Sequence, residues 1–340
     1  MTSNKEKDKK PVPTLIPRRK KHSLVDFMMM SVDEVYDQFR TLPGAVMVGK
    51  GMQRFMYVPA TRQNSVLLVA HADSVWDDKE IKLGQTDHRL FSVNEKSGCR
   101  ADDRCGITML WKLRNLGHAL LIPDGEEKHG QGSEFLMGQE DWRKEINKHQ
   151  FAIQMDRMND ADLAFYGVAS NQFKDWCEKQ FKGYKRLHGM WTDICNLCSE
   201  YRHKTDCLDG VNISVGYYRQ HTTEEYVELS EWHRTLSLLY ENLSKEEIPK
   251  FHHSYTPPPP PSSYTPHTDS SRGYTGHRCG SYDYMPTSNV NTYKREVSEI
   301  DVLSGTLVCP RPDCEGMMDE GEYRQNKNAC IYCNEGFQLA

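Results

Sequence analysis

Four short apolar runs, five to seven residues long, stand out along the chain. They are residues 65–70 (SVLLVA), 118–122 (HALLI), 151–155 (FAIQM) and 211–217 (VNISVGY). Runs of this length and apolarity are typical of strands in the interior of a parallel or mixed sheet, buried on both faces. Because the carboxyl ends of parallel strands lie at one edge of a sheet, we expect the residues that follow these runs to gather there.

Apolar residues recur at helical spacing in two other parts of the chain. Ile107, Leu110 and Trp111 form an apolar stripe, and Gly117 stands where a helix would stop. We therefore expect the acidic Asp103 to begin that helix, since carboxylates are favoured at helix N-termini.

A second helix is expected near residue 229. Thr222 and Glu225 have capping-box spacing, and apolar residues then recur at helical intervals that indicate a buried face. These are Leu229, Trp232, Leu236, Leu239 and Leu243.

Strands that alternate with helices predict an α/β fold. We expect three αβα layers, with helices on both faces of a mixed, largely parallel sheet, over residues 23–248. Residues 1–22 are basic and proline-containing and read as a disordered tail. A tail of this kind is usually solvated, although contact with nucleic acid or an address signal is an alternative.

The segment 249–303 has the composition of a linker. It contains five consecutive prolines, 257–261, and many Ser, Tyr, Gly and His residues. Proline fixes an extended backbone, so a semi-rigid spacer is expected, ahead of a ligand for an aromatic-lined groove.

Two cysteine pairs in residues 304–340 have the spacing of a tetrahedral four-thiolate zinc site. They are Cys309-x4-Cys314 and Cys330-x2-Cys333, each followed by Glu-Gly. The segment resembles a zinc ribbon, in which one structural Zn²⁺ stabilises a fold with little core of its own. Its partner is expected to be a macromolecule. Two disulfides are the alternative, and they require an oxidising compartment.

Other cysteines give no comparable signal. Cys195-x2-Cys198 with His203 and Cys207 is a candidate for a further metal site, but ordinary thiols are the preferred interpretation.

Composition narrows the function classes. A hydrophobic fraction of 37% indicates that much of the chain lies outside a core, and a net charge of −5 argues against a general nucleic-acid or membrane surface. No apolar stretch approaches the ~20 residues that span a bilayer. Eleven cysteines without an apolar leader lead us to expect reduced thiols and a cytoplasmic setting.

Polar residues at or just beyond the apolar runs indicate the chemistry. Two close cations need a carboxylate between them, with imidazole and carboxylate ligands on either side. Zinc is the default metal for such ligands, with manganese or cobalt as alternatives. The series reads as a two-metal hydrolase site: His71-x-Asp73, Asp102-Asp103, Glu126-Glu127, Asp156 and His221.

This series resembles that of the zinc-dependent exopeptidases with a co-catalytic two-metal site, the superfamily of leucyl-type and tripeptide aminopeptidases. The likeness covers roughly residues 60–240 and is carried by LLVAHADSVW, GCRADDRCGITML, LLIPDGEEKHGQGS, FAIQMDR and NISVGYYRQHTTEEYV.

The resemblance implies a role for each member. Asp102 would bridge two zinc ions, with His71 and Asp156 completing one and Glu127 and His221 the other. Glu126 would be the general base toward a metal-bridging water. Asp73 would hydrogen-bond His71 and fix its tautomer, and the loop at Thr192-Asp193 would border the substrate.

The implied activity is removal of an N-terminal residue from a peptide. A carboxypeptidase or an N-acyl amino-acid deacylase would use the same ligands, and a non-catalytic zinc-binding interaction module is the alternative from another class. A scaffold needs no general base, so Glu126 favours an enzyme.

Many members of the superfamily carry an inserted lid or dimerisation domain. Here the intervals from 71 to 102 and from 156 to 221 span 31 and 65 positions, too short for a domain of about 100 residues. We therefore expect one compact catalytic domain, and substrate selection and dimerisation do not carry over from the resemblance.

Overall fold

A computed structural model of the chain describes residues 14–15, 22–199, 207–253, 306–308 and 317–319. The chain divides into two compact units, Met1–Gly280 and Ser281–Ala340. The expected site and the four apolar runs all belong to the first unit.

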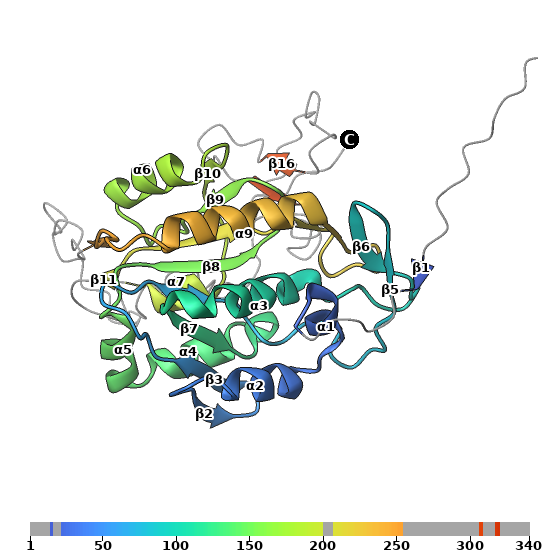
Figure 1. Ribbon diagram of the computed structural model, residues 1–340, viewed down its shortest axis with the longest axis horizontal. Coiled ribbons are helices and arrows are strands. Elements are labelled where there is room, and N and C mark those ends of the chain that lie inside the picture. The colour runs from blue at the N-terminus through green and yellow to red at the C-terminus, as the bar shows by residue number, and fades with distance from the viewer. Residues whose placement is uncertain (1–13, 16–21, 200–206, 254–305, 309–316, 320–340) are drawn as a thin grey trace, which may run out of the picture. The chain divides into compact units, whose positions relative to one another are not determined.

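An eight-stranded mixed sheet runs through the first unit (Figure 1). Its four central strands, β12, β8, β4 and β7, are parallel to one another, while β3 and β2 are antiparallel at one side. At the other side β9 is antiparallel to β12 and parallel to β10. In spatial order the strands are β10 (Lys185–Leu187), β9 (Asp162–Ala164), β12 (Gly210–Ser214), β8 (Ala152–Arg157), β4 (Leu67–Val69), β7 (Ala119–Pro123), β3 (Gln53–Val58) and β2 (Val46–Lys50).

Helices cover both faces of this sheet, and the alternation of strand side chains explains why. In β4, Leu68 belongs to one apolar cluster, whereas Leu67 and Val69 belong to the other. The Leu68 face is covered by α1 (Leu24–Met29), α2 (Val32–Arg40), α3 (Ala101–Leu113), α6 (Asn171–Gln180) and α9 (Leu229–Leu243). The opposite face is covered by α4 (Gln131–Met137), α5 (Glu140–Ile146) and α7 (Asp193–Leu197).

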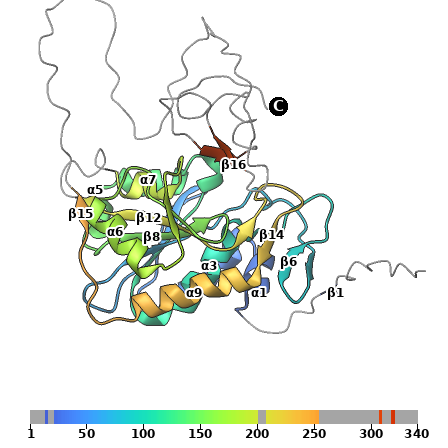
Figure 2. The same cartoon turned by 90° about the horizontal axis from the view of Figure 1, so that it is seen from above.

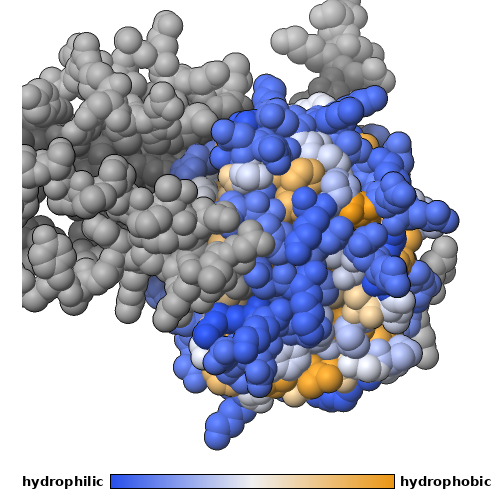
Figure 3. Space-filling model, turned by 90° about the vertical axis from the view of Figure 1, so that its left-hand side faces the viewer, coloured by the Kyte–Doolittle hydropathy of each residue, from blue (hydrophilic) through white to orange (hydrophobic). Residues whose placement is uncertain are grey.

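Figure 2 shows this layering from the side, with α3 and α9 on one side of the central strands and α7 on the other. The predicted αβα architecture with a mixed, largely parallel sheet is therefore confirmed. Hydrophilic side chains cover most of the face drawn in Figure 3, with apolar residues in small separate patches.

The first unit also has a smaller antiparallel sheet, whose strands come before, between and after those of the main sheet in the chain. It contains β1 (Thr14–Leu15), β5 (Leu83–Gln85), β6 (Arg89–Ser92), β14 (Tyr226–Glu228) and β13 (Tyr217–Tyr218). Residues between positions 71 and 102 therefore form β5 and β6, and the last two strands flank the loop that carries His221.

Local sequence signals fix the first two helices. Ser23 accepts the N–H of Asp26 at 3.2 Å, and the Asp26 carboxylate accepts the N–H of Ser23 at 2.9 Å, which completes a capping box. Ser31 and Glu34 repeat the arrangement at the start of α2.

The expected elements appear with small shifts. The run at 151–155 becomes β8, which extends to Arg157, so Asp156 lies inside the strand end instead of beyond it. Helix α3 continues as a 3-10 turn, η1 (Arg114–Leu116), and Gly117 follows with a φ of 78°. Helix α9 spans the expected residues, and its buried side chains include Trp232 and Leu239.

The expected capping box before α9 is wrong. Thr222 is seven residues ahead of the helix start at Leu229, and the Glu225 carboxylate turns away to bind backbone amides of residues 99–102. The spacing was a coincidence, because an outside segment competes for the same carboxylate.

The first unit continues past residue 248. Phe251 packs against Phe151 and Phe173 with ring centroids 6.0 and 5.3 Å apart. Strand β15 (His252–His253) pairs with β11 (Cys207–Leu208). These contacts attach the start of the expected linker to the first unit.

The second unit has one described hairpin of antiparallel strands, β16 (Thr306–Val308) and β17 (Met317–Asp319). The four cysteines at 309, 314, 330 and 333 lie outside the described residues, as does His203. Cys195, Cys198 and Cys207 are buried. Among the described helices, none is long and apolar enough to cross a membrane.

Candidate metal centre

Three neighbouring parallel strands deliver the core of the predicted series to one edge of the main sheet. His71 lies two residues beyond β4, Asp156 lies near the end of β8, and the Glu126-Glu127 pair forms the 3-10 turn η2 (Glu126–Lys128) after β7. The start of α3 adds Asp102, and the loop between β13 and β14 adds His221.

Asp102 stands between the two histidines. Its Oδ1 lies 3.0 Å from Nε2 of His71, and its Oδ2 lies 3.2 Å from Nε2 of His221. Each oxygen therefore faces a different imidazole, as a carboxylate that joins two cations would.

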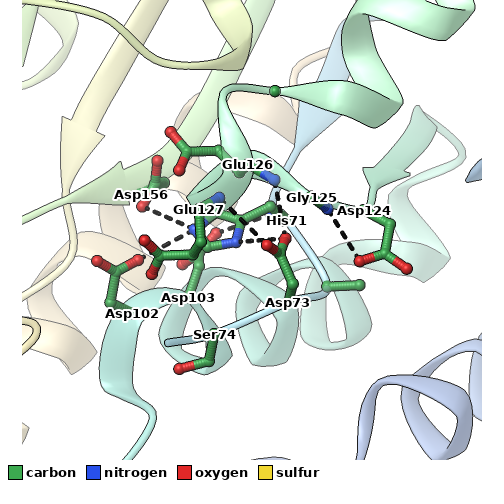
Figure 4. Close-up of polar contacts among 12 residues, drawn as sticks. His71, Asp73, Ser74, Asp102, Asp103, Asp124, Gly125, Glu126, Glu127 and Asp156 are labelled. Carbon is green, nitrogen blue, oxygen red and sulfur yellow. Dashed lines mark hydrogen bonds and ion pairs between the residues drawn. The ribbon is translucent and has the colours of Figure 1, made fainter. Parts of the chain in front are cut away.

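Further carboxylates flank the two histidines on their outer sides. Oδ1 of Asp156 is 3.5 Å from Nε2 of His71, and Oε1 of Glu127 is 3.0 Å from Nε2 of His221. The structure thus brings all five predicted ligands together. Figure 4 shows four of them, His71, Asp102, Glu127 and Asp156. Potential ligand atoms of His71, Asp102 and Glu127 all lie within 4.8 Å of one another.

Asp103 has a different task, although its carboxylate also lies near His71 and Asp156. One oxygen accepts the N–H of Gly106 at 2.9 Å and the other accepts the N–H of His71 at 3.2 Å. It therefore caps the helical part of α3, as expected, and ties that helix to the residue after β4.

Asp73 supports the centre from below, as Figure 4 shows. Its Oδ1 lies 3.3 Å from Nδ1 of His71, and its two oxygens accept the N–H groups of Glu126 at 3.0 Å and Glu127 at 3.1 Å. Burial opposes the charge of Asp73, but these contacts outweigh it and hold the pKa of the carboxyl below its usual range. One carboxylate thus orients His71 and fixes the Glu126-Glu127 turn.

The sequence interpretation missed the residues that hold Asp156. Oδ2 of Asp156 accepts hydrogen bonds from Nε2 of Gln154 at 2.8 Å and from Oγ1 of Thr192 at 3.0 Å. The Tyr217 hydroxyl donates to Oδ1 at 3.2 Å. A signal existed, since Gln154 is polar within an apolar strand and shares the strand face of Asp156 two residues later.

Negative charge accumulates around the base candidate Glu126. Burial raises the pKa of Glu126 well above its usual value, and the carboxylates of Asp156, Asp193 and Glu127 add to the effect against His71. Burial lowers the pKa of His221, but Asp102 and Glu127 overcome it and raise the value to about 11. Such a crowd of buried acids around two imidazoles is the charge pattern that divalent cations would balance.

Asp193 is a further acid at the site, at the first position of α7. It is fully buried, and neither oxygen makes a hydrogen bond of good geometry among the described residues, although the Ser133 side chain lies close enough to stabilise its charge. Burial raises the pKa of this carboxyl to about 7. A buried and unsatisfied carboxyl beside a candidate catalytic centre points to a missing partner.

The donor set fits zinc on chemical grounds. Imidazole nitrogens and carboxylate oxygens are ligands that Zn²⁺ accepts. The Nδ1–H of His71 donates to the Asp73 carboxylate, as the second ring nitrogen of metal-bound histidines usually does.

Comparisons with known proteins give structural matches only. No family model matches the chain, and no curated protein matches it. Aminopeptidase PepT from Bacillus cereus is similar over 65% of this chain and 96% of its own, with 13% identity and a TM-score of 0.48. A tripeptidase from Staphylococcus aureus is similar over 65% of this chain and 95% of its own, with 10% identity and a TM-score of 0.45. An aminopeptidase from the archaeon Desulfurococcus kamchatkensis is similar over 63% of this chain and 91% of its own, with 10% identity and a TM-score of 0.45.

Proposed function

We propose that the chain is a two-metal hydrolase that cleaves peptide bonds. The observation that carries the proposal is the placement of Asp102, whose two oxygens face His71 and His221 at 3.0 and 3.2 Å. In this assignment His71, Asp102 and Asp156 hold one zinc, and Asp102, Glu127 and His221 hold the other.

Each remaining polar residue then has a task. Two bound cations would acidify a water molecule and polarise the substrate carbonyl. Glu126 is the base that takes the water's proton and passes it to the leaving amine. Asp73 keeps His71 in one tautomer and fixes the backbone that presents Glu126.

An aminopeptidase is the preferred activity because of Asp193. A protonated α-amine is the natural complement of a buried carboxylate that no cation among the described residues faces and whose hydrogen bonds are incomplete, whereas a carboxypeptidase would need a cation to bind its substrate. A carboxypeptidase or N-acyl amino-acid deacylase is the second candidate, since the same metal ligands serve both.

We also propose that Cys309, Cys314, Cys330 and Cys333 hold a structural zinc in a module that binds a macromolecular partner. Their spacing supports this assignment.

The base assignment is tested with Glu126→Gln. Because glutamine keeps the shape but cannot accept the proton, turnover should fall by about 10²- to 10⁴-fold, with zinc content and unfolding temperature unchanged. The measurement pairs metal analysis with cleavage of a panel of free-amine, N-acetylated and C-amidated peptides, with products identified by mass. Parent-level turnover in the variant would remove Glu126 from the mechanism, and a parent protein that cleaves only N-acetylated substrates would replace the aminopeptidase with the deacylase.

A further inference from the structure

Glu225 is a buried acid that the proposed reaction does not use. It lies four residues after His221, in the loop between β13 and β14, and its exposed fraction is 0%. A carboxylate in such a place is unfavourable unless several hydrogen bonds compensate the lost hydration.

Three backbone N–H groups from one distant segment supply that compensation. Oε2 of Glu225 accepts the N–H of Cys99 at 2.8 Å and the N–H of Arg100 at 3.0 Å. Oε1 accepts the N–H of Asp102 at 3.1 Å. Both oxygens are therefore used to hold the backbone that leads into Asp102.

The segment is shaped to receive this carboxylate. A Cβ at Gly98 would lie 2.3 Å from Oε2 of Glu225, so no larger side chain fits there without moving it. The Cys99 thiol also donates to the Glu225 carbonyl at 3.4 Å. Arg100, at a φ of 61°, turns its guanidinium toward the carbonyls of Met30, Trp76 and Asp77 and closes the other side of the turn.

Glu225 thereby joins two loops whose side chains meet at the candidate centre. Its own loop carries His221, and the loop that it holds carries Asp102, whose Oδ2 lies 3.2 Å from Nε2 of His221. The His71 side is supported separately, by Asp73 and Asp103. Asp102 is shared by both metal positions, but the His71 position keeps the separate support of Asp73 and Asp103. Loss of Glu225 should therefore weaken the His221 position more than the His71 position.

We propose that Glu225 is the positioning residue of the His221–Glu127 metal position, acting by fixing the backbone of Asp102 relative to the His221 loop. This inference rests on the proposed two-metal function and adds a separate support for its second metal. Glutamine is a poor substitute, since its NH₂ group would face a backbone N–H where the carboxylate has an acceptor.

The test is a stepwise zinc titration of the full-length chain against a competing chelator, with zinc alone as the probe. Wild-type protein should release its two site metals in two steps. Glu225→Gln should weaken one of them, the step that His221→Ala removes, by at least tenfold and the other by clearly less. Zinc held by the four-cysteine segment is bound alike by all the proteins compared, so it does not contribute to the difference between their titrations.

Two further variants separate positioning from general stability. Gly98→Ala keeps the Glu225 side chain but forces its carboxylate, together with Trp76, to move away from the added methyl group. It should give the same selective loss even if Glu225→Gln does not fold. Thr235, in α9, has a buried hydroxyl that donates to the Ser214 carbonyl at 3.0 Å. Thr235→Val removes this hydrogen bond and should lower the unfolding temperature with both zinc affinities retained.

Equal weakening of both metals in the Glu225 and Gly98 variants, or of neither, would overturn the positioning role. A wild-type chain that binds no zinc through His71 and His221 would instead overturn the proposed function, and this inference with it. Site variants His71→Ala and His221→Ala, each expected to remove a different step of the titration, identify which result applies.

Discussion

Several polar side chains of this molecule are buried, although such groups are normally hydrated. His118 shows this away from the candidate centre. Its Nδ1 accepts the N–H of Val66 at 3.0 Å, so its Nε2 carries the proton and donates to the Leu243 carbonyl at 2.9 Å. Both ring nitrogens are used by the neutral form, and a second proton would break the contact with Val66.

His118 should therefore make stability depend on pH. Burial lowers the pKa of His118 to about 4, below its unfolded value of about 6.5. The unfolded chain binds a proton that the folded chain does not, so stability is fully present above about pH 6.5 and is lost as pH falls toward 4, by on the order of 3 kcal/mol.

The measurement is urea unfolding of wild type and His118→Asn at pH 7.5 and pH 4.5. Asparagine still offers an oxygen to Val66 but does not titrate, so the variant should be less stable at pH 7.5 and lose less on acidification. His149 and the acids of the centre titrate in both proteins and cancel. An equal loss in the two proteins would contradict the role of His118.

Asp193 gives a prediction about the substrate. Asp193→Asn should reduce kcat/KM for free-amine peptides by about 10- to 100-fold, the value of a hydrogen bond to a charged group. Because the loss should come from KM, kcat at saturation should change little. N-acetylated peptides provide the matched comparison, and an equal effect on both substrate types would assign Asp193 a structural role.

At the scale of elements, the chain places ligands on regular structure and supports them from neighbouring elements. Asp156 is on β8, but its Oδ2 is held by Gln154 from the same strand and by Thr192 at the start of α7. Gln154 also accepts the N–H of Ile194 through Oε1 at 3.0 Å, so it links the strand to that helix. The orientation of one ligand thus depends on the contact between β8 and α7.

Removing the donors to Asp156 should test that dependence. Thr192→Val keeps the shape of the side chain and removes one hydrogen bond, and Gln154→Leu removes the other. Each should lower zinc affinity or turnover by about 10- to 100-fold, as loss of such supporting contacts does. Thr108→Val, which removes a buried hydroxyl bonded only within α3, is the matched control. A control as impaired as the two variants would show that packing, rather than Asp156, is responsible.

Element identity itself was predictable where the signal is local. The four apolar runs gave strands close to their expected bounds, and Gly117 ends the α3 and η1 turn as its left-handed φ requires. The expected capping box at Thr222 failed because helix α9 starts at Leu229 and Glu225 has a better partner elsewhere. Local spacing cannot reveal a competitor that comes from another segment.

At the scale of the whole molecule, the question is what the second unit contributes. The first unit extends to Gly280, and residues up to His253 are tied to it by Phe251 and by the pairing of β15 with β11. A truncation should therefore leave these residues in place. The chain that ends at residue 280 is the appropriate variant.

This shortened chain should cleave small peptides within about twofold of the full-length rate, because every residue of the candidate two-metal centre precedes residue 280. It should also contain one zinc fewer per chain if the four cysteines hold a structural metal. Metal analysis and peptide cleavage of the two proteins measure both expectations. An unchanged zinc content would contradict the four-thiolate site, and loss of peptide cleavage would give the second unit a part in catalysis.

The sequence by itself determined the four central strands, helices α3 and α9, and which polar residues meet at one edge of the sheet. Apolar runs and the residues that follow them are local features, and parallel strands bring their carboxyl ends together in any such fold. Only the tertiary structure decided that each oxygen of Asp102 faces a different histidine, that Gln154 and Thr192 hold Asp156, and that Glu225 holds the turn before Asp102. Most of these contacts join segments far apart in the chain, and their geometry depends on how strands, helices and loops pack, which no local pattern encodes.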